Sequence, residues 1–141
     1  MKDNNSLFFQ QLDSCIKSYR HFQQKMLDEG GIDITPDQWL CLGLISRGKS
    51  LTQREIAQKL GKDTASVNRI LALIIKKGYI SRISADGKTA KPTVTESGRI
   101  VFEAAAAIIN AAGEAAMTGI KPKRTAKLEK TLRDITKNLK Q

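Results

Sequence analysis

The fold is decided by residues 50–95, which read SLTQREIAQKLGKDTASVNRILALIIKKGYISRISADGKTAKPTVT. The pattern within this stretch predicts two short helices, a strand, a basic loop and a returning strand, in that order. The first helix begins at Thr52, whose hydroxyl forms a capping box with the carboxylate of Glu55. Gly61 follows the last apolar residue of this helix and supplies the backbone freedom that a tight turn into the next helix requires.

The second helix has the periodicity of a helix that packs on a core. Asp63 is its expected N-cap, and the helix extends from Thr64 to Lys77, where Gly78 ends it. Apolar residues recur along it at spacings of three and four, namely Val67, Ile70, Leu71 and Ile74. This stripe predicts the buried side of the helix.

The opposite side of that helix suits the major groove of DNA, because its side chains are small or polar and it has few carboxylates. An arginine there can donate two hydrogen bonds to guanine, an asparagine can pair with adenine, and the amides at a helix start can hold a phosphate. The expected DNA contacts of the two helices and their turn are Thr52, Lys62, Thr64, Ala65, Ser66, Asn68, Arg69 and Lys76.

A β-hairpin is predicted after the second helix. Residues 79–84 are β-prone, residues 85–91 form a basic loop, and residues 92–95 return alongside the first strand. Pro92 cannot donate to a strand ladder, so it belongs on an edge or at a strand start. Lys88 and Lys91 are the expected DNA contacts of this wing. The whole order is that of a winged helix-turn-helix, mainly α with a small β-wing.

The positive charge of the chain is concentrated in the same region. Residues 47–99 contribute +8 of the net +10, from twelve Lys or Arg against four Asp or Glu. Residues 1–46 sum to −2 and residues 100–141 to +4. A basic segment that coincides with a helix-turn-helix is the pattern expected for a polyanion partner, here double-stranded DNA.

Four short motifs resemble the MarR family of bacterial transcription regulators, and the similarity of order and spacing covers about residues 6–140. The motifs are TPDQW at 35–39, LTQREIA at 51–57, KKGYISR at 76–82 and VTESG at 94–98. The chain departs from the family in the wing, where Asp86-Gly87-Lys88 stands in place of the usual Asp-x-Arg. A single ammonium therefore replaces the fork-shaped guanidinium that such wings place in the minor groove.

The two ends of the chain predict a homodimer. Apolar stripes run along a helix at the amino terminus and along a last helix after Pro122, and a long Ala-rich helix lies between Glu96 and about Thr118. The stripes consist of Phe8, Leu12, Cys15, Ile16, Tyr19, Phe22 and Met26 in the first helix and of Leu128, Leu132, Ile135 and Leu139 in the last. Each stripe needs cover from another helix, which a second copy can supply. The resemblance implies the same arrangement, an intertwined homodimer.

We therefore predict a single domain, 1–141, with residues 6–46 and 97–141 as a helical dimerisation region and residues 47–96 as the winged helix-turn-helix. A twofold dimer would present its two recognition helices one DNA turn apart, ~34 Å, and so select a near-palindromic operator.

The resemblance also implies a mechanism. The dimer represses transcription until a small aromatic or amphipathic effector enters between the terminal helices and the winged helix-turn-helix of residues 47–96, here called the reading unit, and releases the DNA. Phe22, Met26 and Trp39 are the candidate effector-binding residues, and ordinary core packing is the alternative. A further alternative for the whole chain is an architectural, effector-independent DNA-binding protein, which would bind without preferring one operator.

The two cysteines are too few for a disulfide framework. Because some relatives in the MarR family sense peroxides through a cysteine on the first helix, Cys15 is a redox candidate, with Lys17 and Arg20 as possible stabilisers of its thiolate. Packing as a small buried hydrophobe is the favoured interpretation. Cys41 lies in an apolar segment and is expected in the core.

The sequence offers little for catalysis or metal binding. It has no Gly-rich phosphate loop, no HExxH motif and no paired acids beside a base, so an enzyme is not predicted and no cofactor is expected. His21 has no Asp, Glu or Cys at ligand spacing, so a surface position is expected and no metal. Neither a signal peptide nor an apolar stretch long enough for a bilayer is visible, which favours the cytoplasm.

Overall fold

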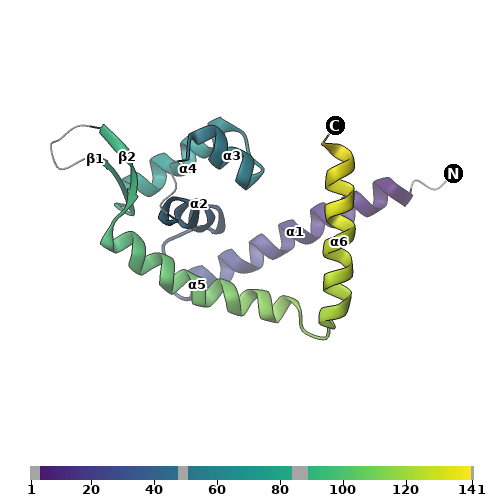
Figure 1. Cartoon of the computed structure of the whole chain (residues 1–141). Coiled ribbons are helices and arrows are strands. Elements are labelled where there is room, and N and C mark those ends of the chain that lie inside the picture. The colour runs from purple at the N-terminus through teal and green to yellow at the C-terminus, as the bar shows by residue number, and fades with distance from the viewer. Residues whose placement is uncertain (1–3, 48–50, 84–88, 141) are drawn as a thin grey trace.

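The computed structural model describes residues 4–47, 51–83 and 89–140, and these ranges contain six helices and a two-stranded antiparallel sheet (Figure 1). The helices are α1 (Asn4–Glu29), α2 (Pro36–Ser46), α3 (Gln53–Leu60), α4 (Thr64–Lys76), α5 (Glu96–Ala116) and α6 (Pro122–Leu139), and the strands are β1 (Ile80–Ile83) and β2 (Thr89–Val94). None of the helices in the described ranges is long and apolar enough to cross a membrane. The predicted class, mainly α with a small β-wing, is confirmed.

Side-chain caps determine where helices α2 and α3 begin. The capping box predicted for α3 is confirmed, with Thr52 Oγ1 and Glu55 N at 3.1 Å and Thr52 N and Glu55 Oε1 at 3.1 Å. A second box precedes α2, where the hydroxyl of Thr35 accepts from the amide of Gln38 at 3.1 Å. The predicted helix ends are confirmed to within a residue or two, because each depends on such local hydrogen bonds.

The hairpin differs from its prediction in length. Strand β2 begins at Thr89 instead of residue 92, and Thr89 pairs with Ile83 across the antiparallel ladder. Lys91 is therefore a strand residue and does not belong to the loop. Pro92 lies inside β2, which is tolerated because in a two-stranded sheet each strand has an edge with no neighbour to receive an N–H.

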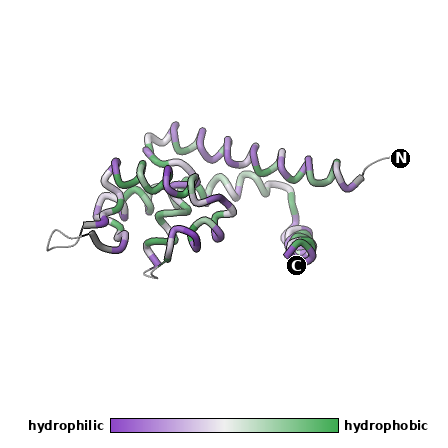
Figure 2. The backbone as a smooth tube through the Cα atoms, turned by 90° about the horizontal axis from the view of Figure 1, so that it is seen from above, coloured by the Kyte–Doolittle hydropathy of each residue, from purple (hydrophilic) through white to green (hydrophobic). Residues whose placement is uncertain are grey.

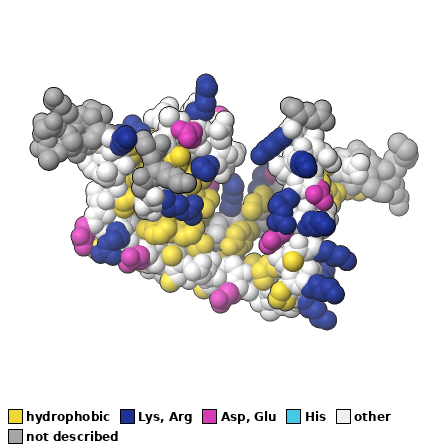
Figure 3. Space-filling view, in the orientation of Figure 1, with side chains coloured by type: hydrophobic (Ala, Val, Ile, Leu, Met, Phe, Trp, Pro, Cys, Tyr) yellow, Lys and Arg dark blue, Asp and Glu magenta, His cyan; other side chains and the backbone are white. Residues whose placement is uncertain are grey.

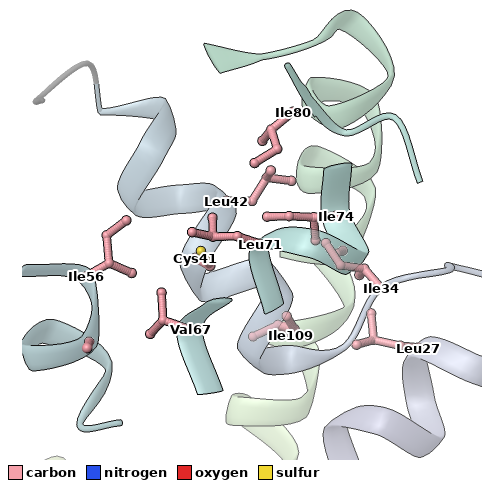
Figure 4. Packing of buried hydrophobic residues seen from close by; sticks show 12 residues of the cluster. Leu27, Ile34, Cys41, Leu42, Ile56, Val67, Leu71, Ile74, Ile80 and Ile109 are labelled. Atoms are coloured by element: carbon pink, nitrogen blue, oxygen red, sulfur yellow. The ribbon is translucent and has the colours of Figure 1, made fainter. Parts of the chain in front are cut away.

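The core lies where α2, α4 and β1 meet and extends to α3, α5 and the end of α1 (Figure 4). Leu42, Leu71 and Ile74 are at most 2% exposed, and Ile80 from the first strand packs with them. The buried stripe predicted for the recognition helix is thereby confirmed, apart from Ile70, which is half-buried. Cys41 is fully buried as predicted, and this burial raises the pKa of its thiol to about 11.

The two terminal helices leave apolar surface uncovered in the single chain. No residue of α6 is buried. Helix α6 crosses α1 in the view of Figure 1, but Figure 2 shows the two helices apart, and α6 is separate from α3, α4 and the hairpin in both views. Hydrophobic side chains gather in the hollow between the reading unit and α6 (Figure 3). Large exposed apolar residues of these helices include Leu7, Phe9 and Ile16 in α1 and Leu128 and Leu139 in α6.

One sequence-based interpretation is wrong for the single chain. Cys15 is exposed on α1 and is not buried as a small hydrophobe. Its neighbour Lys17 forms an ion pair with Asp13 at 2.8 Å, on the exposed side of the helix. The apolar pattern placed Cys15 correctly on the stripe of α1, but this part of the stripe has no partner within the chain. His21 is exposed, as predicted.

Candidate nucleic-acid interface

The turn between α3 and α4 determines how the second helix leaves the first. Gly61 adopts a left-handed conformation with φ of +66°, and its amide hydrogen-bonds back to Ala57 O and Gln58 O. The amide of Lys62 then donates to Ala57 O at 2.9 Å. A side chain at position 61 would be strained in this conformation, so glycine permits the short turn that places α4 across α3.

The start of α4 is capped by Asp63, as the sequence predicts. Its carboxylate accepts from the backbone amide of Ser66 at 2.7 Å. This backbone hydrogen bond is the main reason why the pKa of Asp63 is lowered, and a hydrogen bond from the side chain of Ser66 adds to it. The cap defines the first turn of α4, which carries the outward-facing residues.

Most of the predicted DNA contacts share one face of α4. Thr64, Ala65, Asn68, Arg69 and Lys76 are exposed, and Ser66 between them is half-buried. Arg69 Nη2 donates to Ser66 Oγ at 3.1 Å, which holds the guanidinium against the first turn of the helix. The structure therefore brings six of the predicted contacts together opposite the side that packs on the core. Helix α4 itself contains no Asp or Glu, and the carboxylate of Asp63 caps its start.

The other predicted contacts are less uniform. The hydroxyl of Thr52 is occupied as the cap of α3, although the residue is exposed. Lys62 forms an ion pair with Asp37 of α2 at 3.1 Å, with both side chains less than a third exposed, so its ammonium ties α2 to the turn. Lys91 is exposed on β2. Lys88 lies outside the described residues.

A cavity of about 630 Å³ lies between the reading unit and the start of α5. Apolar residues from α2, α3, β2 and α5 line it, among them Ile45, Ile56 and Phe102, and so do the cations Lys91 and Arg99. Arg99 is shared by two carboxylates, Glu96 at 3.3 Å and Glu103 at 3.1 Å. The lining residues of this cavity could not be identified from the sequence, because they come from segments far apart in the chain.

The three candidate effector residues do not line this cavity. Trp39 stacks on Phe102 with ring centroids 5.2 Å apart, and its indole N–H donates to Phe102 O at 3.1 Å. Trp39 therefore stands directly behind one wall of the cavity. Phe22 and Met26 lie on α1, the first exposed and the second half-buried. The structure does not bring these three side chains into one pocket.

Within the described ranges, no group of three or more His, Cys, Asp or Glu is placed to hold a metal ion. The features that are present, two capped helices joined by a glycine turn and followed by an antiparallel hairpin, define a winged helix-turn-helix protein.

Comparison with known proteins agrees with this class and narrows it. Residues 32–88 match the family model of the MarR family. The chain is therefore similar to the MarR family over this segment, which includes α2, α3, α4 and β1. No curated protein sequence matches the chain.

Three solved structures show how far the likeness extends. The crystal structure of the transcriptional regulator PA3341 has a TM-score of 0.76 at 24% identity, over 94% of this chain and 97% of that one. A MarR-family regulator from Rhodococcus sp. RHA1 has a TM-score of 0.75 at 18% identity, over 96% of both chains. The Mycobacterium tuberculosis MarR-family protein Rv2887 in complex with salicylic acid has a TM-score of 0.68 at 18% identity, over 96% of this chain and 97% of that one. At these identities the structures support the fold.

Proposed function

We propose that this chain is a DNA-binding transcriptional regulator that acts as a homodimer, recognises a near-palindromic operator and represses transcription until a small effector releases it. Residues 47–96 read the DNA, and residues 6–46 and 97–141 hold the two copies together. The proposal places the protein in the cytoplasm, where its DNA lies. The match of residues 32–88 to the MarR family model and a DNA complex of Rv2887, which is 16% identical to this chain, agree with it.

The observation that carries the proposal is the outward face of α4. Its apolar side is buried in the core, so the helix cannot turn that face elsewhere, and the side left to solvent carries Asn68, Arg69 and Lys76. A guanidinium and an amide are the side chains that read guanine and adenine in the major groove. Ala65, on the same face, leaves room for bases to approach the helix.

The dimer follows from the uncovered apolar surface of α1 and α6. Leu7, Ile16 and Leu128 are between 45% and 60% exposed, so these two helices carry large apolar side chains that nothing in the single chain covers. A second copy covers them and sets the distance between the two recognition helices. Without the dimer each reading unit would bind a half-site by itself, and the spacing between half-sites would not affect binding.

The effector is proposed for the crevice between the terminal helices and the reading unit, where the cavity beside Phe102 lies. The complex of Rv2887 with salicylic acid supports a small aromatic ligand. Trp39 supports one wall through Phe102, and Phe22 and Met26 remain candidates on α1. Cys15, exposed on α1, remains a redox candidate, because an exposed thiol is accessible to peroxide.

Selection of bound duplexes from a random pool, followed by salt titrations with variants, tests the proposal. Arg69→Ala should cost ~1 to 3 kcal/mol on the selected duplex and relax preference at one base position. Lys91→Ala should weaken all sequences alike and lower the slope of log affinity against log salt by about one unit. Lys25→Ala, on the exposed side of α1, is the control and should change neither quantity.

Selection of a twofold-symmetric sequence would support a regulator. Salt-sensitive binding without any selected sequence would support the architectural alternative. No binding to duplex DNA in dilute buffer would refute the proposal.

A further inference from the structure

The carboxyl end of α4 is held from one side by the connection between α1 and α2. The ammonium of Lys77 forms an ion pair with Asp33 Oδ1 at 3.0 Å. It also donates to the backbone oxygen of Asp33 at 3.4 Å and to Gln38 Oε1 at 3.0 Å. An ammonium has three hydrogens, and these three acceptors match them.

This arrangement distinguishes Lys77 from its neighbour. Lys76 is exposed on the outward face of α4, whereas the side chain of Lys77 is 24% exposed and turns back toward α2. Gln38, one of its partners, is 4% exposed, and the same Oε1 accepts from the amide of Thr35 in the capping box of α2. Lys77 is therefore built into the capping network of α2 and is not presented to a phosphate.

Tyr79 adds a second tie to the same loop. Its hydroxyl donates to the backbone oxygen of Asp33 at 2.8 Å. Burial, and then the nearby carboxylate of Asp33, raise the pKa of Tyr79, so the hydroxyl keeps the proton that it donates. Lys77 and Tyr79, one and three positions beyond the end of α4, thus both bond to Asp33. Asp33 lies four positions beyond the end of α1.

The start of α5 holds the same segment from the other side. Thr95 Oγ1 donates to Gly78 O at 2.6 Å, and the amide of Thr95 donates to Tyr79 O at 3.0 Å. Ser97 Oγ donates to Gly78 O at 2.9 Å. The residues between α4 and β1 are consequently bonded both to the loop after α1 and to the first turn of α5, the two helices that lead into the dimerisation region.

We propose that Lys77 and Tyr79 are positioning residues, which fix the angle of the recognition helix relative to α1 and thereby set the half-site spacing that the dimer accepts. The inference rests on the proposed function, because spacing has meaning only for a dimer that binds an operator. A rotation of α4 about the core would move its outward face along the groove, and these bonds are the ones that such a rotation must break.

The test compares operators that differ only in spacing. The duplex selected by the unmodified protein is prepared with its spacer unchanged and with one or two base pairs added or removed, and a further duplex keeps one half-site only. Full-length Lys77→Met and Tyr79→Phe are measured on all of them. Lys25→Met loses the same charge on the exposed side of α1 and serves as the control, and Lys77→Arg keeps a cation at the junction.

Lys77→Met and Tyr79→Phe should bind the single half-site as the unmodified protein does. Their preference for the selected spacer over the altered ones should fall by about two- to thirtyfold, the range that coupled positions away from a ligand usually show. Lys77→Arg should restore the preference, and Lys25→Met should leave it unchanged. A Tyr79→Phe variant retains its ring and its packing, so it tests the bond itself even if Lys77→Met folds poorly.

A variant that is only less stable would lose affinity on every duplex by the same factor, without reordering the spacings. That uniform loss, or an unchanged spacing profile in both variants, would overturn the inference and leave the proposed function intact. Failure of the unmodified chain to bind any duplex would overturn the proposed function, and this inference with it.

Discussion

Replacement of Gly98 by alanine should unfold the protein at a markedly lower temperature. A Cβ at this position would lie 2.1 Å from Tyr79 O and 2.9 Å from Tyr79 C, both backbone atoms that cannot rotate away. An ordinary contact between such atoms is longer by more than roughly 1 Å, so α5 would have to move away from the α4–β1 connection. That movement would stretch the bond between Thr95 N and Tyr79 O, now 3.0 Å.

The expected magnitude follows from three contributions. Overpacking against a rigid neighbour costs about 3 kcal/mol, and loss of one hydrogen bond costs about 1 kcal/mol more. Alanine in place of glycine in a helix returns about 1 kcal/mol. The free energy of unfolding should therefore fall by about 3 kcal/mol, which corresponds to roughly 10 °C in Tm for a chain of this size.

Gly113→Ala is the matched control in the same helix. The nearest atom to a Cβ there is the hydroxyl of Tyr19 at 3.3 Å, the end of a side chain that can shift by a few tenths of an ångström. The gain in helix propensity should dominate, so this variant should be as stable as the unmodified protein or more stable by up to about 1 kcal/mol. Both are measured by thermal melting at one protein concentration, because association shifts Tm. If Gly98→Ala melts no lower than Gly113→Ala, the reasoning from close backbone approach is wrong.

Three further predictions concern the cap, the core thiol and the dimer. Because the pKa of Asp63 is lowered in the folded chain, its carboxylate contributes fully to the free energy of unfolding above the ordinary aspartate pKa, and this contribution is lost as the pH falls through the lowered pKa. The free energy of unfolding, measured from about pH 5 to 2, should therefore depend less on pH in Asp63→Asn than in the unmodified protein. Identical pH profiles would refute the cap. Cys41 should resist a maleimide at neutral pH until denaturant is added, because burial raises its pKa to about 11; its prompt labelling in the folded chain, located by mass spectrometry, would contradict this. Leu128→Glu should shift the mass measured by light scattering toward the monomer, whereas the neighbouring exposed change Lys123→Glu should not; equal masses would count against burial of the α6 stripe.

The features that the sequence predicted correctly are those with local causes. The capping box of Thr52, the cap at Asp63 and the left-handed Gly61 each depend on residues within four positions of one another. The buried stripe of α4 follows from helical periodicity alone. These features were sufficient for the winged helix-turn-helix and for the outward face of its second helix.

The features that the sequence did not reveal depend on contacts between distant segments. Lys77 bonds to Gln38, which is 39 positions away in the sequence. In the local sequence Lys77 differs from Lys76 only in its position on the helix, seven residues after the half-buried Ile70 and therefore on nearly the same side. A lysine beside the buried side of a helix requires a polar partner, and this position was the only sequence feature that could have indicated one. Lys62 is similar, because its partner Asp37 belongs to another helix. Thr89 joined β2 because Ile83 offered a pairing position across the hairpin, which β-propensity alone did not specify.

Charge decides which surfaces of two copies can cover each other. Helix α6 contains six Lys or Arg against two Asp or Glu, whereas α1 contains three of each. Two α6 helices laid side by side would each meet a net charge of the same sign, and such a contact is opposed by repulsion. An α6 helix laid on α1 of the other copy meets a neutral surface with exposed apolar residues, so its stripe can be covered at no electrostatic cost. In the proposed dimer the last helix of one copy therefore packs on the first helix of its partner. Lys and Arg side chains line the visible face of α6 in the single chain (Figure 3), and in this arrangement they would remain in solvent.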